Sequence, residues 1–257
     1  MPSKKKDKPE SAPSSKFQKY GAHWLLGTRA LEIEMACIRK GGKWEKEGRE
    51  CGKGLAFHYN EMRKILWPSM DNHRWMELCL KEAVACKILT LIGAGATGKT
   101  HFAAWFSLCQ YYCSPDDTIV LISSTDIRGL ELRVWGAVKH LHEEALSRHD
   151  VPGNLIDSKH AITTNDVEEE SVRDMRSGVV GIPTISGGKS VGLGKWLGVH
   201  QKHVRLVADE AQFMGSSFLS AFSNLKNSVR FKGICIGRRH EFLDPRGKAA
   251  EPRGGWG

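Results

Sequence analysis

Short apolar runs rich in β-branched residues recur along the chain and predict strands. They are bounded by Gly, Pro, Ser or Asp and span residues 88–92, 118–123, 179–185, 204–208 and 233–236. Runs of this length between turn-forming residues are typical of buried strands. Segments with helical spacing of apolar residues lie around and between them, at 73–86, 101–113, 126–149 and 216–227. Because strands alternate with helices, the pattern predicts an α/β fold, with a mostly parallel sheet that helices flank on both faces.

The segment before this alternation has a different composition. Residues 1–19 contain six lysines diluted by Ser and Pro, which predicts a disordered basic tail. Residues 20–66 carry an apolar-periodic stretch and then a stretch rich in Gly, Lys and Glu, which predicts a small helical N-terminal extension. Trp67-Pro68 interrupts that pattern, and Asn72 is placed to cap the helix that follows. The remaining residues, 67–257, suit one α/β domain.

A phosphate-binding pattern, Gly-x4-Gly-Lys-Ser/Thr, is matched by Gly93, Ala94, Gly95, Ala96, Thr97, Gly98, Lys99 and Thr100. A predicted strand precedes it and a predicted helix follows, which is the setting that the pattern requires. The glycines let backbone N–H groups surround phosphate oxygens at a helix N-terminus. Lys99 is then expected to reach the β- and γ-phosphates, and the Thr100 hydroxyl to bind Mg²⁺. The alternative, a glycine-rich turn with an incidental lysine, is disfavoured by the flanking strand and helix.

A second motif agrees with the first. The apolar run 204–208 ends in Asp209 and Glu210, as the acidic strand of a Walker B motif does. We expect Asp209 to hold a magnesium-bound water and Glu210 to polarise the attacking water as general base. A solvated turn is the usual alternative for such a pair. The phosphate-binding pattern earlier in the chain favours the catalytic interpretation, and with it an ATPase.

Composition restricts the partners and the compartment. No apolar run has the roughly 18 residues that a membrane span needs, so no membrane association is expected. Seven cysteines in a nucleotide-using chain indicate a reducing interior. Cys37, Cys51 and His58 are a weak zinc alternative, because no Cys-x2-Cys pair accompanies them. A net charge of +9 favours a polyanionic partner, although the N-terminal tail is as consistent with a solubilising role as with DNA contact.

Several segments together resemble the ATPase domain of a tailed-bacteriophage large terminase, the DNA-packaging motor. They are the phosphate-binding pattern, Ser123-Ser124-Thr125 after the second strand, the helical segment 133–139 (Arg-Val-Trp-Gly-Ala-Val-Lys), Asp209-Glu210-Ala211, and 244–252 (Asp-Pro-Arg-Gly-Lys-Ala-Ala-Glu-Pro). The resemblance extends from about Trp67 to residue 257. Segments 133–139 and 244–252 are the narrower signals, because many ATPases share the phosphate-binding pattern and the acidic strand end.

The resemblance implies a P-loop NTPase of the additional-strand, catalytic-glutamate type, in which another strand separates the loop strand from the acidic strand. It implies ATP hydrolysis with Mg²⁺ that drives double-stranded DNA into a procapsid. The implied partners are the portal, the small terminase subunit and further copies of the chain in a ring, in the cytoplasm of an infected bacterium. Residues upstream of the loop contact adenine in this family, which points to Arg74 or Trp75, although Trp75 also suits a helix core.

Two departures from the family concern residues that act on the γ-phosphate. Many terminases carry an arginine inside the phosphate loop, where this chain has Ala94-Gly95-Ala96. They also end the strand after Walker B with a small polar residue that senses the γ-phosphate, whereas this strand leads into Arg238 and Arg239, and an arginine could sense a phosphate directly. The family often supplies a trans-acting basic residue shortly before Walker B. The glycine-rich loop expected at 187–198 offers Lys195 and then Lys189 for that role, with Arg238 and Arg239 as competitors and a solvated loop as the plain alternative.

Two other functions remain open from the sequence. Asp209-Glu210-Ala211-Gln212 also fits a helicase motif, so another DNA-dependent ATPase core is possible. A nucleotide-gated assembly module with little turnover is the other. Large terminases usually continue into a metal-dependent nuclease domain, and no acidic cluster for one is evident, so this chain is expected to be the ATPase half alone.

Overall fold

The computed structural model describes residues 46–164, 175–186, 189–190, 201–214, 216–226 and 231–238. The predicted basic tail, the apolar stretch at 24–38, residues 191–198 of the glycine-rich loop and segment 244–252 lie outside these residues. The division of the chain into tail, extension and domain therefore stays a prediction.

One eight-stranded sheet organises the fold, with the strand order β1-β8-β7-β2-β5-β4-β3 and β6 paired to β5. The strands are β1 (Ile88–Ile92), β2 (Thr118–Asp126), β3 (Asn154–Ile156), β4 (Ala161–Thr163), β5 (Gly178–Ser186), β6 (Lys189–Ser190), β7 (His203–Ala208) and β8 (Phe231–Gly237). Strands β1, β8, β7, β2 and β5 are parallel to one another. Strands β3, β4 and β6 pair antiparallel with their neighbours. The mixed α/β fold with a mostly parallel sheet is confirmed. The apolar pattern predicts no element in the segment that forms β3 and β4.

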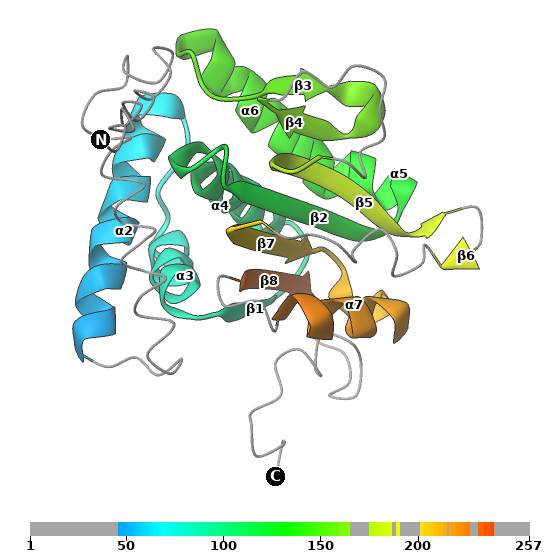
Figure 1. Ribbon diagram of the computed structural model, residues 1–257. Coiled ribbons are helices and arrows are strands. Elements are labelled where there is room, and N and C mark those ends of the chain that lie inside the picture. Colours follow the sequence, from blue (N-terminus) through cyan, green and yellow to red (C-terminus); the bar gives the residue numbers. More distant parts are fainter. Residues whose placement is uncertain are drawn as a thin grey trace, which may run out of the picture.

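Helices cover both faces of the sheet (Figure 1). One core cluster joins the sheet to α2 (Lys46–Leu66), α3 (Arg74–Ala85), α4 (Lys99–Cys113) and α6 (Gly136–Arg148), and a second joins it to α7 (Ser216–Lys226). The alternation within β2 shows why two layers are needed. Val120 and Ile122 belong to the first cluster, and Ile119 and Leu121 to the second. A strand that is apolar at successive positions is stable only when both faces are covered.

Helix α4 is the centre of the larger layer. Its residues from Phe102 to Cys113 are all buried, so its sequence is apolar all round rather than amphipathic. Helix α2 packs against it through Tyr59, which meets Phe106 edge to face with ring centroids 5.6 Å apart. Trp67 stacks on Tyr112, and its indole N–H donates to a backbone carbonyl of α6 over 2.7 Å. The described part of the predicted N-terminal extension therefore shares the core of the sheet domain.

The segment predicted as one helix at 126–149 contains a π-helical turn. It consists of α5 (Ile127–Gly129), the π-helical turn η2 (Leu130–Trp135) and then α6. The Asp126 side chain caps its start by accepting a hydrogen bond from the Gly129 backbone N–H over 2.8 Å. A π turn accommodates an extra residue and is frequent at functional sites. Apolar periodicity alone did not reveal it.

The expected helix cap at Asn72 is wrong. The residue at the N-cap of α3 is His73, which makes no side-chain capping bond. The Asn72 amide instead donates to the carboxylate of Glu77 in α3 over 2.8 Å, so Asn72 contacts the helix through a side chain and not through its first-turn amides. Asn72 lies one residue too early to accept from the first-turn amides, so the prediction failed by its register.

Candidate nucleotide-binding site

The carboxyl ends of the parallel strands meet at one edge of the sheet, where open α/β folds bind ligands. Strand β8 lies between β1 and β7, so one strand separates the loop after β1 from the acidic turn after β7. Adjacent strands lie about 4.8 Å apart, which places these two ends roughly 10 Å from one another. A nucleoside triphosphate with its metal ion can span the distance between the loop and the acidic turn. The strand order is the one that the additional-strand interpretation requires.

The loop after β1 has the backbone shape of a close turn into a helix. Gly98 is left-handed, with φ +80°, and Ala96 also has a positive φ of 56°. Helix α4 begins at Lys99, so the loop delivers its last amides to the N-terminus of a helix. A Cβ at Gly98 would lie 3.0 Å from the Trp75 ring, so a side chain here would be strained by both φ and space.

The Lys99 ammonium lies inside this loop. It donates to the Gly93 carbonyl over 3.1 Å, to the Thr97 hydroxyl over 2.9 Å and to the Ala94 carbonyl. The ammonium group of Lys99 therefore lies against the loop backbone and does not extend into solvent. The three donors of the ammonium bind neutral acceptors, and phosphate oxygens, which bind such donors more strongly, could replace these acceptors.

The turn after β7 carries the two predicted carboxylates. Asp209 is 2% exposed, and its backbone N–H donates to the Ser123 carbonyl over 2.8 Å. Glu210 is left-handed with φ 52°, and the buried Gln212 amide donates to its carboxylate. Among the described residues, only His160 joins Ala96 and Glu210 as a non-glycine residue with positive φ. Strained backbone therefore concentrates at the two turns where nucleotide chemistry was predicted.

Arg133 is a contact of Asp209 that the sequence did not single out as a site residue. Its Nε donates to the Asp209 carboxylate over 3.0 Å, and its Nη2 donates to the Ser124 hydroxyl over 2.9 Å. Burial raises the pKa of Asp209 above its ordinary value, Arg133 opposes that rise, and the charge of Glu210 adds to it. The signal in the sequence was an arginine about two turns after Ser-Ser-Thr, within the segment 133–139 that carries the family resemblance.

The four cation candidates have different outcomes. Arg238 directly follows β8, whose last residue pairs with the last residue of β1. Its Nη2 lies 3.5 Å from the point where a Cβ on Gly95 would be, so its guanidinium reaches the phosphate loop. Lys189 is in β6, where only its backbone is described. Lys195 and Arg239 lie outside the described residues.

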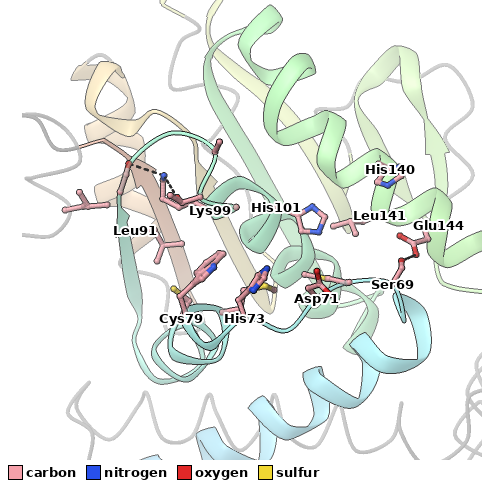
Figure 2. Close-up of a pocket in the computed structure, with 18 residues that line it drawn as sticks. Ser69, Asp71, His73, Cys79, Leu91, Lys99, His101, His140, Leu141 and Glu144 are labelled. Atoms are coloured by element: carbon pink, nitrogen blue, oxygen red, sulfur yellow. Dashed lines mark hydrogen bonds between the residues drawn. The ribbon is translucent and has the colours of Figure 1, made fainter.

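A cavity of about 940 Å³ adjoins the loop. Figure 2 shows Lys99 at one side of it and His140 and Glu144, from α6, at the other. Trp75 lines the cavity, while Arg74 is exposed and is not among its lining residues. Trp75 also meets Phe102 edge to face at 6.2 Å, so it borders both the core and the cavity. Of the two residues predicted to contact adenine, Trp75 lines this cavity and Arg74 does not.

The cavity is also lined by several carboxylate and imidazole groups. Asp71, His73, His101 and Glu144 line it together with His140. Burial lowers the pKa of His101, the neighbouring His140 lowers it further, and Glu144 opposes this. These residues come from a loop, α4 and α6, so only the tertiary fold brings them together.

Among solved structures, the chain is similar to the crystal structure of the HK97 bacteriophage large terminase, with a TM-score of 0.50 and 11% sequence identity. The similarity covers 71% of this chain and 37% of that terminase, so the chain spans just over a third of the terminase's length. The chain has a terminase-like fold. The resemblance drawn from the motifs is confirmed at this level. No protein-family model and no curated protein matches the sequence.

Two remaining expectations concern a metal cluster and a membrane span. Within the described residues, no group of three or more His, Cys, Asp or Glu side chains could hold a metal ion. The zinc alternative is not tested, because Cys37 and the side chain of Cys51 lie outside them. Over the same residues, no helix has the length and apolar character that crossing a membrane requires.

Proposed function

We propose that this chain is the ATP-hydrolysing motor domain of a viral DNA-packaging terminase, which acts in the cytoplasm of an infected bacterium. One observation carries the proposal. A phosphate-binding loop and an acidic strand end meet at the same edge of a terminase-like sheet, separated by β8. The loop supplies donors for phosphates, and the strand end supplies carboxylates for a metal and for water.

Nucleotide binding would use groups that the loop already presents. Helix α4 begins at Lys99, so the loop leads into a helix N-terminus, whose first backbone N–H groups have no partner within the helix and whose dipole favours an anion. Lys99 would exchange its carbonyl partners for β- and γ-phosphate oxygens. Trp75, at the wall of the cavity beside Gly98, offers a ring face or edge for the base.

The oxygen donors fit Mg²⁺. The ion prefers hard oxygen ligands, and it is commonly held by one or two carboxylates with substrate phosphates rather than by a protein cage. Thr100, in the first turn of α4, and Asp209 supply such oxygens from the two ends of the site. When bound, Mg²⁺ would supply positive charge to offset the negative charge that develops on the phosphates during transfer.

Glu210 would take the proton of the attacking water. Its backbone is fixed in a left-handed conformation, and Gln212 holds its carboxylate, so its position does not depend on a flexible side chain alone. A positioned general base contributes about 10²–10⁴-fold to a rate. Without that carboxylate the site would still bind nucleotide, which is the behaviour of a nucleotide-gated assembly module.

A second cation near the γ-phosphate would stabilise the transition state, and Arg238 is our candidate to supply it within one chain. Its guanidinium adjoins the loop at Gly95, where many terminases carry an arginine of their own. A guanidinium also offers the planar fork that a lysine lacks. A trans-acting Lys195 or Lys189 would instead require a ring. Mixing Lys195→Ala with Glu210→Gln subunits distinguishes the two: restored turnover favours the ring, and turnover per subunit that is the same at all protein concentrations favours Arg238.

Double-stranded DNA is the proposed substrate of the motor, with the portal and the small terminase subunit as partners. The net charge of +9 supports a polyanionic partner, and such binding should be independent of sequence and weaken steeply with salt. The test is ATP turnover alone, with duplex DNA and with portal-bearing procapsids. Stimulation by procapsids supports the packaging motor, unwinding of a forked duplex would assign a helicase, and nucleotide binding without turnover would assign the assembly module.

A further inference from the structure

Arg133 holds a carboxylate of the proposed site without having a part in the proposed chemistry. The carboxylate belongs to Asp209, which is buried in the turn after β7, whereas Arg133 comes from the π-helical turn η2. The two residues meet only through the fold. An arginine in contact with a metal-ligating carboxylate can orient that ligand or compete with the metal for it. The geometry around the guanidinium separates these possibilities.

The guanidinium lies in a built slot. Its Nε donates to Oδ2 of Asp209 over 3.0 Å, and its Nη2 donates to Oγ of the buried Ser124 over 2.9 Å. Gly129 forms the wall, because a Cβ at that position would lie 2.6 Å from Nη2. Two different acceptors and the close approach of Gly129 fix the plane of the guanidinium. These fixed contacts favour the orienting role, because a cation that only competes with the metal for the carboxylate does not require a fixed plane.

The backbone on either side of Gly129 also positions the guanidinium. The side chain of Asp126 caps the segment that contains Gly129, which positions the wall. The π turn that follows carries Arg133, and such turns re-aim side chains relative to a regular helix. Arg133 keeps 41% of its side chain exposed, so it reaches the carboxylate from the solvent side and is not part of the apolar core.

We propose that Arg133 is a positioning residue for Asp209. Its Nε–H fixes Oδ2 and thereby the rotamer of the carboxylate, which keeps Oδ1 available to a metal-bound water. The proposal rests on the proposed function, since it assigns Asp209 to the metal. Groups that orient a metal ligand in this way are worth about 10–100-fold in metal affinity.

The orienting role and the competing role predict opposite signs. If Arg133 orients Asp209, its removal lowers the affinity of the nucleotide complex for Mg²⁺, because the carboxylate turns freely. If Arg133 competes with the metal, its removal raises that affinity, since one positive charge no longer has to be displaced. A residue that merely supports folding changes the stability of the protein and leaves the affinity of the folded fraction for Mg²⁺ unchanged.

The experiment measures binding of a fluorescent β,γ-imido analogue of ATP over a range of Mg²⁺ concentrations, which needs no turnover. The variants are Arg133→Met, Arg133→Lys and Gly129→Ala, and the last two keep the charge in case the first fails to fold. Lys139→Met is the matched control, because it removes another cation of the same helical run, one paired with the exposed Asp157.

We expect Arg133→Met to raise the Mg²⁺ concentration needed for half-maximal binding by about 10–100-fold. Arg133→Lys should recover part of the loss, and Gly129→Ala should reproduce part of it by pushing the guanidinium out of its slot. Lys139→Met should match the wild type. Equal Mg²⁺ dependence in all variants, or tighter Mg²⁺ binding in Arg133→Met, would overturn the proposal. An analogue that fails to bind the wild type at any Mg²⁺ concentration would instead overturn the proposed function.

Discussion

The loop after β1 and the turn after β7 lie at the same edge of the sheet, yet they present different chemical groups. The loop consists mainly of backbone groups around one lysine, and most of its residues are exposed. The turn presents side chains, and its Asp209 is buried against a guanidinium. Both turns contain a residue with positive φ. An exposed backbone loop can accept a large ligand with little rearrangement, whereas a buried carboxylate depends on neighbours that hold its charge and direction.

The difference predicts that removing a charge has different consequences at the two ends. At the loop, the loss should affect ligand binding and leave folding nearly unchanged. At the turn after β7, the loss should affect either catalysis or stability, depending on which member of the buried group is replaced.

The largest effect is expected at Glu210. Glu210→Gln keeps the size of the side chain and removes the base, so ATP turnover should fall by about 10²–10⁴-fold while nucleotide affinity changes little. Steady-state phosphate release and equilibrium binding measure the two quantities. Glu61→Gln is the control, since Glu61 pairs with Lys64 on the outer side of α2. Equal turnover in Glu210→Gln and the wild type would remove Glu210 from the mechanism.

Breaking the buried ion pair from its two sides should have unequal effects on stability. Arg133→Met leaves the buried Asp209 without its counter-ion and should lower the free energy of unfolding by about 3 kcal/mol. Asp209→Asn leaves a guanidinium that is 41% exposed and can be solvated, so the loss should stay below about 1 kcal/mol. Urea denaturation at neutral pH measures both. Equal losses would contradict the asymmetry of burial.

A buried imidazole far from both turns shows whether burial alone produces such sensitivity. His142 accepts from the Tyr112 hydroxyl over 2.6 Å and donates to the Gly153 carbonyl, and burial lowers its pKa to about 4. Its unfolded pKa is about 6.5, so the unfolded state binds the proton first. Stability from this group is present above about pH 6.5 and is lost as pH falls toward 4, by about 3 kcal/mol. His142→Gln should flatten this part of the stability profile, and an unchanged profile would contradict the assignment.

The smallest effect on folding is expected at Lys99. Lys99→Met should weaken ATP binding by about 10–100-fold, because a charged donor to the phosphates is lost. The free energy of unfolding should change by less than about 1 kcal/mol, since the partners of Lys99 are exposed or half-buried carbonyls and a hydroxyl that water can satisfy. Lys64→Met controls for the loss of a surface charge. A stability loss like that of Arg133→Met would remove the contrast between the two ends.

The sequence predicted the loop and the acidic strand end because each is a contiguous pattern with a local cause. Glycine spacing specifies the turn at Gly98, and an apolar run followed by carboxylates specifies Asp209. The order of the strands is not local, and it came from the family resemblance alone. The α/β pattern itself fixes neither β8 between β1 and β7 nor the antiparallel strands β3 and β4.

The contacts that complete the candidate site were out of reach for the same reason. Arg133 lies 76 positions before Asp209, and a π turn sets its direction. Helical periodicity over 126–149 gave no sign of that turn. Arg238 was named only because it follows a strand, and its approach to Gly95 depends on the pairing of β8 with β1. Long-range pairing of this kind requires the tertiary structure.

The central claim is that the loop after β1 and the turn after β7 bind one and the same metal–nucleotide complex. Replacing Mg²⁺ by Fe²⁺ in the presence of ATP, and then starting hydroxyl-radical cleavage with ascorbate and peroxide, tests this directly. The account predicts backbone cuts at both places, near 98–101 and near 208–210, which disappear together when Mg²⁺ is added in excess. Cuts near only one of the two places, under conditions in which ATP binds, would contradict it.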